Sequence, residues 1–331
     1  MTDLFERWPT VQKADALIRN TRPPDYFPPW DKFTRAWARA LKVSDEQLAI
    51  CCGPNLGAII DTLFEQAPPS DETHASLESA IQAATEPEQA KAILAQTPND
   101  ALSALRNQIA VATELGCEKL ASRPILARRW LEAWSEAIRL HAAHQSKHEK
   151  ARARAHLPPD ESARHKSFED AVAHYVESFT HTDAFSTTMI AIFPCLSFAS
   201  EALLEDFVKL SKKIAPFMRV IADVIHNDEE DINIGLFTLS HEHGISLAIA
   251  KKSLYEQRLS RQDVQVRMAN HAADLLKELQ LAFDEVLRKH GEPERTNLSN
   301  FFELIKGISL RRIHEAHPEL ARNSQPKGST A

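Results

Sequence analysis

Apolar residues recur every three to four positions along most of this chain, in runs that proline residues separate. One run holds Trp30, Phe33, Trp37 and Leu41, and the next, NLGAIIDTLFEQ, ends at the proline pair 68–69. This spacing places apolar side chains on one face of an α-helix. We therefore expect amphipathic helices that pack around a shared core.

Composition argues against a sheet protein. The 331 residues include only 8 glycines, and runs of Val, Ile, Thr and aromatic residues bounded by turn residues are few. Strong helix formers dominate instead. Because no repeat or shift in composition divides the chain, we predict one all-α domain over residues 31–320. An irregular strap interrupted by proline pairs is expected before it, over residues 1–30, and a disordered tail after it, over residues 321–331.

Charge and cysteine usage limit the partners and the compartment. The formal net charge of −7 gives no reason to expect a nucleic-acid partner. Cys51, Cys52, Cys117 and Cys195 have no CxxC spacing, so we predict free thiols in a reducing compartment. The sequence has neither a signal-peptide pattern nor a run of about 18 apolar residues. We expect a cytoplasmic protein without a membrane partner.

Capping residues and prolines predict the remaining helices. Ser70 and Asp71 cap a helix that Pro87 ends. Apolar residues 183–199 surround Pro194 and predict a broken, buried helix. Further helices are expected from Asn99-Asp100 to about Ala121, from Pro124 to about Gln145, over Gln262–His290 and over Asn297–Glu315.

A basic segment follows the helix that starts at Pro124. Residues 144–166 are polar, strongly basic and interrupted by a proline pair, which predicts a loop. Its first cations are Lys147, Lys150, Arg152 and Arg154. They either supply charge for binding phosphate or form a solvated surface.

The densest group of carboxylates ends an apolar helix, in the segment 214–231, IAPFMRVIADVIHNDEED. Asp223, Asn227 and Asp231 lie at i, i+4 and i+8, so on a helix they share one face. Three oxygen-bearing side chains in such a row can hold a hard divalent cation. The alternative is a solvated acidic helix end.

Three segments together resemble the class I terpene synthases. Residues 233–250, NIGLFTLSHEHGISLAIA, follow the pattern after the acidic helix end in that family, and SFEDAVAHYV at 167–176 is similar to an upstream family helix. FPCLS at 193–197 lies where a kinked helix lines the family's pocket. The resemblance implies a single helical bundle around a central cavity. It also implies a Mg²⁺-dependent lyase, with Mn²⁺ as the substitute, that ionises and cyclises a prenyl diphosphate, farnesyl or geranylgeranyl.

The resemblance carries the first metal motif of the family, DDxxE, onto Asp61 and Glu65. Thr62 stands where the second aspartate is expected. The two carboxylates keep the i, i+4 spacing and share a helix face. Asp71-Glu72 is a nearby fallback, and an ordinary amphipathic helix with two polar positions would also fit.

The second metal motif of the family is carried over onto Asp223, Asn227 and Asp231. Two other registers remain open, one over 222, 226 and 230 and one over 227, 231 and 235. Each of these loses a ligand, and the register with three oxygen ligands therefore suits Mg²⁺ best.

The resemblance also implies diphosphate-binding and pocket residues. Arg311 and Arg312 stand for a C-terminal Arg-Tyr pair, without the tyrosine, whereas the arginine expected upstream of the acidic helix is missing from residues 174–178. His241 and His243 lack the spacing of a zinc site. Aromatic faces stabilise a carbocation, and each candidate is otherwise a core residue. The candidates are Phe64, Tyr175, Phe185, Phe193 and Phe198.

The most concrete interpretation is therefore a terpene synthase with altered metal motifs. Two alternatives remain open. One is a homologue that binds a prenyl diphosphate or a modified substrate without the usual cyclisation. The other is a helical interaction module whose acidic and basic segments are docking surfaces. Because many proteins of this fold dimerise, a homodimer also remains an open alternative.

Overall fold

The computed structural model describes residues 8–22, 24, 27–44, 47, 56–153, 184–225 and 261–316. Within these ranges all regular secondary structure is helical, which confirms the all-α prediction. A short 3₁₀ helix, η2, spans Phe193–Cys195. The α-helices are α2 (Thr10–Arg19), α3 (Phe27–Leu41), α5 (Leu56–Gln66), α6 (Asp71–Ala83), α7 (Pro87–Leu94), α8 (Ala101–Lys119), α9 (Pro124–Ala153), α11 (Ala184–Ile192), α12 (Glu201–Ile225), α15 (Arg261–Lys289) and α16 (Glu294–Ala316).

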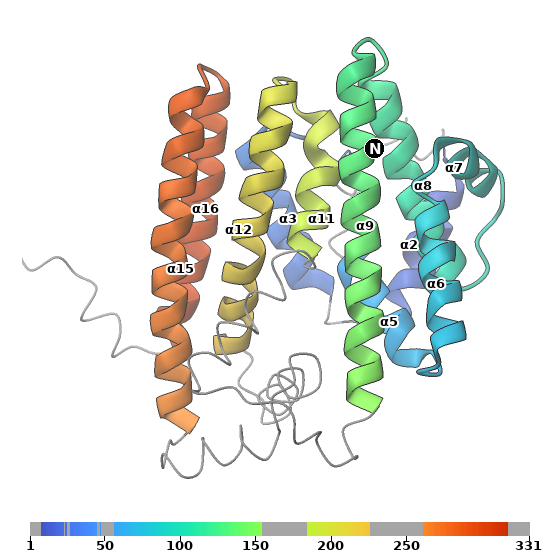
Figure 1. The fold of residues 1–331 in the computed structure, drawn as a ribbon, viewed down its shortest axis with the longest axis horizontal. Coiled ribbons are helices and arrows are strands. Elements are labelled where there is room, and N and C mark those ends of the chain that lie inside the picture. The colour runs from blue at the N-terminus through green and yellow to red at the C-terminus, as the bar shows by residue number, and fades with distance from the viewer. Residues whose placement is uncertain are drawn as a thin grey trace, which may run out of the picture.

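Helix α11 lies at the centre of the packing. It contacts α9 and α5 on one side and α12 on the other, and α12 in turn packs along α15. Figure 1 shows α9, α12 and α15 as long, roughly parallel columns, with α6, α7 and α8 beyond α9. The shorter helices α2 and α7 pack against α8. The described helices therefore share a common core around α11.

Local sequence signals explain several helix boundaries. The Ser70 hydroxyl accepts a hydrogen bond from the backbone N–H of Thr73, as predicted for the cap of α6. Pro87 does not end α6, contrary to expectation, because α6 ends at Ala83 and Pro87 opens α7. Proline is favoured at the first helical position, where its missing N–H is not needed.

Two further expectations are wrong in part. Residues 10–19 were predicted to be irregular but form helix α2, which buries Val11, Ala14 and Ile18 on one face. The first turn of α3 contains the proline pair 28–29. Residues 144–153 were predicted to be a loop but continue α9. The remainder of that segment and the tail at 321–331 lie outside the described residues.

A pair of stacked tryptophans forms the centre of the α8–α9 interface. The rings of Trp130 and Trp134 lie 6.4 Å apart and nearly parallel, and both are fully buried. The Trp130 indole N–H donates to the carbonyl of Ile190 in α11, and that of Trp134 donates to the hydroxyl of Thr113 in α8. The two indoles therefore join three helices through both packing and hydrogen bonds.

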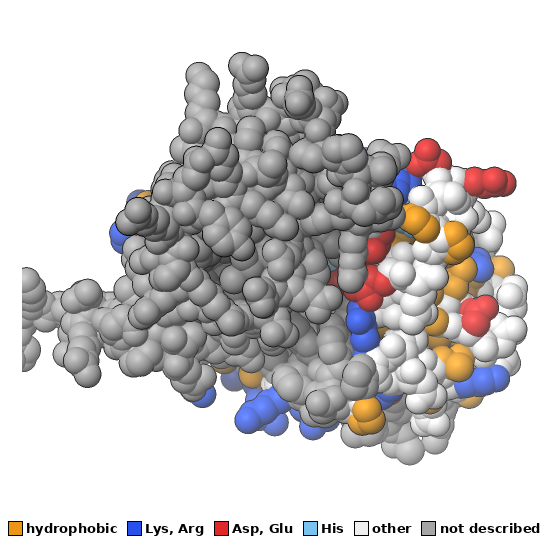
Figure 2. Space-filling view, turned by 90° about the horizontal axis from the view of Figure 1, so that it is seen from below, with side chains coloured by type: hydrophobic (Ala, Val, Ile, Leu, Met, Phe, Trp, Pro, Cys, Tyr) orange, Lys and Arg blue, Asp and Glu red, His pale blue; other side chains and the backbone are white. Residues whose placement is uncertain are grey.

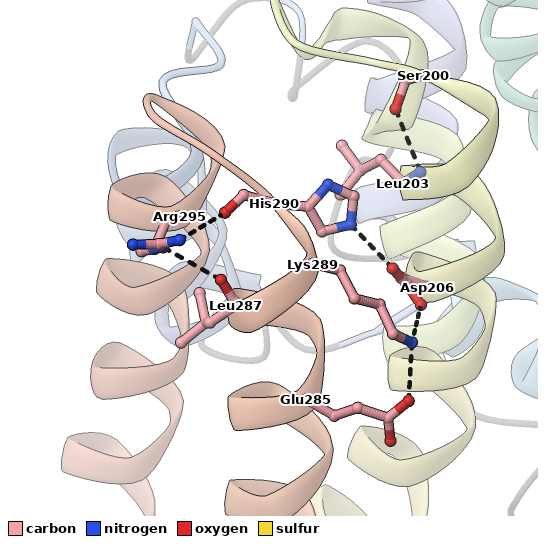
Figure 3. Close-up of polar contacts among 8 residues, drawn as sticks. All are labelled: Ser200, Leu203, Asp206, Glu285, Leu287, Lys289, His290 and Arg295. Carbon is pink, nitrogen blue, oxygen red and sulfur yellow. Dashed lines mark hydrogen bonds and ion pairs between the residues drawn. The ribbon is translucent and has the colours of Figure 1, made fainter.

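A polar cluster joins α12 to the end of α15 (Figure 3). The buried carboxylate of Asp206 accepts from His290 Nε2 at 2.8 Å and from Lys289 Nζ at 3.4 Å. Arg295 donates to the carbonyls of Leu287 and His290, which closes the turn between α15 and α16. These carbonyls are among those that a helix C-terminus leaves without an intrahelical partner.

Replacing Asp100 with alanine is expected to lower the free energy of unfolding at pH 7 by about 1 kcal/mol, the usual effect of losing an N-cap. Asp100 Oδ1 accepts from the Ser103 backbone N–H at 2.7 Å, and the Ser103 hydroxyl accepts from the Asp100 N–H. The first of these bonds holds the pKa of Asp100 below its ordinary value. A pKa that is lower in the folded state than in the unfolded chain means that the ionised carboxylate stabilises the fold at pH values above the unfolded-state pKa. This stabilisation is lost as the pH falls through the folded-state pKa.

The test is urea unfolding of the wild type, Asp100→Ala and Asp100→Asn at neutral and acidic pH. The difference between wild type and Asp100→Ala should shrink below about pH 4, where a free aspartate protonates. The asparagine variant keeps an acceptor without a titrating group, so its advantage over alanine should not change with pH. A difference between wild type and alanine that stays constant would contradict the role of the charge.

Candidate functional site

Asp61 and Glu65 lie one turn apart on α5, as their spacing predicts. Ile60 and Phe64 are fully buried and fix the orientation of the helix. The carboxylates consequently lie at the edge of the core, with side chains 36% and 33% exposed. Both side chains are therefore accessible from outside the packed interior.

Asp61 contacts a buried histidine on α9. Asp61 Oδ1 lies 3.3 Å from Nε2 of His141, whose side chain is 2% exposed. The other ring nitrogen, Nδ1, lies 3.4 Å from the hydroxyl of Thr187 in α11. The tautomer that donates from Nε2 leaves Nδ1 to accept from the hydroxyl. Three helices thus meet at one imidazole.

Glu65 is paired with a cation from the N-terminal part of the chain. Arg22 Nη2 donates to Glu65 Oε2 at 2.8 Å, and both side chains are partly exposed. Arg22 follows the end of α2, so this ion pair ties the segment between α2 and α3 to α5.

The two carboxylates of α5 offer a donor set that fits Mg²⁺. Asp61 and Glu65 each bond to nitrogen through one oxygen, and the described residues give Asp61 Oδ2 and Glu65 Oε1 no hydrogen-bond partner. Mg²⁺ prefers carboxylate oxygens and retains several waters. Among the described side chains, no three His, Cys, Asp or Glu residues gather as a metal site would require. The pair would therefore form one wall of a site.

The second predicted motif begins in the last turn of α12. Asp223 belongs to this helix, but its side chain lies outside the described residues, as do Asn227 and Asp231. Figure 1 shows the last turns of α9 and α12 and the first turns of α15 at one end of the array. Figure 2 views the molecule from that end, where acidic and basic side chains of the described part lie beside apolar ones. The register of the motif stays a prediction.

The fallback acidic pair lies on α6 and is engaged with α9. Asp71 Oδ1 accepts from Lys150 Nζ at 2.8 Å, and the Asp71 side chain is largely exposed. Nearby, the buried His74 places Nδ1 3.2 Å from the carbonyl of Ser146, and its ring meets that of Phe64 edge-on. One cation of the predicted basic loop is thus part of a helix-to-helix ion pair.

The predicted diphosphate-binding and pocket residues are spread over several helices. Arg311 is exposed on α16; of Arg312 only the helical backbone is described. Phe64 and Phe193 are fully buried, and Phe198 is nearly so. The side chain of Phe185, on α11, and all of Tyr175 lie outside the described residues. The roles assigned to these residues stay predictions.

Two residues beside the carboxylates were not predicted. His141 continues the buried face of α9 that Trp130, Trp134 and Ile138 form, so a polar residue on an apolar stripe was the available signal. Arg22 stands in a proline-rich segment and carries no comparable signal.

Within the described residues, no helix is both long enough and apolar enough to cross a membrane. Cys117 is a free thiol, as predicted, whereas Cys51 and Cys52 lie outside the described residues.

Comparison with known proteins gives one distant structural likeness. No family model matches the chain, and no curated protein matches it. A solved structure of a single-substitution variant of cucumene synthase is similar to it with a TM-score of 0.46 and 14% sequence identity. That match covers 89% of this chain and 95% of the other.

Proposed function

We propose that this protein is a magnesium-dependent terpene synthase that ionises and cyclises a prenyl diphosphate, farnesyl or geranylgeranyl, and releases diphosphate. The observation that carries the proposal is the pair of accessible carboxylates, Asp61 and Glu65, one turn apart on α5. They lie at the edge of an apolar core to which Phe64 and Phe193 belong.

Asp61 and Glu65 would hold metal on one wall, through the oxygens that His141 and Arg22 leave open. Asp223, Asn227 and Asp231 would hold it on the facing wall. Magnesium bound there supplies positive charge that stabilises the departing diphosphate. The family resemblance of the sequence motifs supports this division of roles.

The remaining residues would bind the leaving group and exclude water. In the ionisation step the allylic carbon–oxygen bond breaks, and the electron pair leaves with the diphosphate. Arg311 or Arg312 would contact that diphosphate. The aromatic side chains of Phe64, Tyr175, Phe185, Phe193 and Phe198 would keep the cation dry, and each face stabilises positive charge by about 0.5–2 kcal/mol.

Geranyl, farnesyl and geranylgeranyl diphosphates incubated with the protein should give a hydrocarbon or alcohol from one of them. Gas chromatography with mass spectrometry identifies the product, and EDTA should abolish it. Asp61→Asn and Glu65→Gln should each lower turnover at least about 100-fold, the scale of losing one group that stabilises developing charge. Asp274→Asn and Glu88→Gln make the same chemical changes at exposed sites on α15 and α7 and should leave turnover unchanged.

Turnover that is unchanged in both Asp61→Asn and Glu65→Gln would reject these residues as the metal wall. If no diphosphate reacts while a known synthase works in parallel, the catalytic proposal fails. Isothermal titration with and without Mg²⁺ would then test for a homologue that binds the diphosphate without cyclising it. If the protein binds neither metal nor diphosphate, the helical interaction module is the alternative that remains.

A further inference from the structure

The contact between His141 and Asp61 differs from an ordinary surface ion pair. His141 is almost fully buried, and each of its ring nitrogens faces one oxygen, Asp61 Oδ1 on α5 and the Thr187 hydroxyl on α11. The ring therefore has contacts on both sides that restrain its rotation. Asp61, by contrast, is partly exposed and would otherwise be free to change rotamer.

We propose that His141 is a positioning residue that holds the Asp61 carboxylate so that Oδ2 is presented to a divalent cation. The inference rests on the proposed function, because it assumes that Asp61 is a metal ligand. It adds a residue that no motif in the sequence predicts.

The physical reason is the orientation of a ligand by its outer hydrogen bond. A carboxylate fixed through one oxygen reaches the cation with little loss of conformational entropy, and the second oxygen keeps a defined direction. Loss of such an outer-shell partner typically lowers metal affinity by about 10- to 100-fold. The contacts from Thr187 through His141 to Asp61 also connect α11 to α5.

His74 provides a matched control. It is a second histidine buried on a neighbouring helix, but its Nδ1 faces the Ser146 carbonyl and hydroxyl rather than a carboxylate of the predicted site. Replacing either histidine with leucine removes a buried imidazole, on α9 itself for His141 and on α6 against α9 for His74. Only the replacement of His141 removes a partner of Asp61.

The test measures Mn²⁺ binding by electron paramagnetic resonance in the presence of inorganic diphosphate, since bound Mn²⁺ loses the sharp spectrum of the free ion. His141→Leu should raise the dissociation constant about 10- to 100-fold. His141→Gln can still donate an N–H toward Asp61 and should recover part of the affinity. Thr187→Val should have a smaller effect in the same direction, and His74→Leu should bind Mn²⁺ as the wild type does.

Asp61→Asn separates the two hypotheses. If it weakens Mn²⁺ binding while folded His141→Leu and His141→Gln do not, the positioning role is wrong and the metal site stands. If Asp61→Asn binds Mn²⁺ with the affinity of the wild type, or if neither protein binds Mn²⁺, Asp61 is not a metal ligand. The metal site and the positioning role of His141 are then both wrong. An equal loss in His74→Leu would show general loosening around α9 and would also overturn the inference. Circular dichroism verifies that each variant is folded, and the glutamine and valine variants carry the test if His141→Leu is not.

Discussion

Replacing Gly116 with alanine is expected to lower the free energy of unfolding by about 2 kcal/mol, within the usual range for overpacking a filled core site. A Cβ at this position of α8 would lie 2.0 Å from Cη2 of Trp130 and 2.4 Å from Cζ3. The indole cannot easily move away, because it stacks on Trp134 and donates to the Ile190 carbonyl. The clash therefore outweighs the gain in helix propensity, which favours alanine over glycine by about 1 kcal/mol.

Gly307 offers the matched control on α16. A Cβ there meets no atom within 4 Å, so Gly307→Ala should raise the free energy of unfolding by up to about 1 kcal/mol. Urea unfolding followed by circular dichroism measures both variants. Opposite signs are expected for the same chemical change at two helical positions.

A double-mutant cycle with Trp130→Leu tests the cause. The single change should itself cost roughly 3 kcal/mol, because it leaves a cavity and an unpaired Ile190 carbonyl. In that background the ring atoms that block residue 116 are absent, so adding Gly116→Ala should no longer destabilise. Additive effects of the two changes would contradict close packing between Gly116 and Trp130.

The sequence was sufficient for helices whose signals are local. The helix caps at Ser70 and Asp100 and the break at Pro194 are all found where they were predicted. Each depends on residues within a few positions, so a one-dimensional pattern contains the necessary information.

Elements that depend on distant contacts were predicted poorly. Residues 144–153 have a loop-like composition, but His144, Ser146 and Glu149 are buried, and Ser146 contacts His74 on α6. Packing against another helix thus stabilises a segment that its own polarity does not favour. Helix α2 was missed for a different reason, because the neighbouring prolines obscured its apolar spacing.

The candidate site likewise combines a local feature that the sequence predicted with distant contacts that it did not. The i, i+4 spacing of Asp61 and Glu65 correctly placed both on one face of α5. Their partners, His141 and Arg22, are 80 and 43 residues away in the chain. Only the packing of α5 against α9, and of the segment after α2 against α5, brings them together.

Replacing Asp206 with alanine is expected to lower the free energy of unfolding by about 3 kcal/mol, the upper end of the usual cost of leaving a largely buried hydrogen-bond donor without its partner. The Asp206 side chain is 6% exposed and contacts both His290 and Lys289 (Figure 3). Without it, the largely buried imidazole of His290 loses its acceptor, and the end of α15 loses its polar attachment to α12. Lys289 would keep one of its two acceptors, because it also pairs with the exposed Glu285. The hydrogen bond to Glu285 raises the pKa of Lys289.

Two variants separate burial from charge. Glu205→Ala removes the adjacent carboxylate of α12, which is 61% exposed and paired with Arg129, so it should cost at most about 1 kcal/mol. Asp206→Asn keeps one oxygen that can accept from His290 Nε2, but it loses the negative charge and places an NH₂ donor where an oxygen accepts from Lys289 Nζ. It should therefore lie between wild type and Asp206→Ala. Urea unfolding at one fixed pH measures all three. If Asp206→Ala and Glu205→Ala lower the free energy of unfolding equally, the buried contacts of Asp206 contribute no more than an exposed ion pair does. The attachment of α15 to α12 would then depend on the apolar face of α15, where Leu279, Phe283 and Val286 are buried.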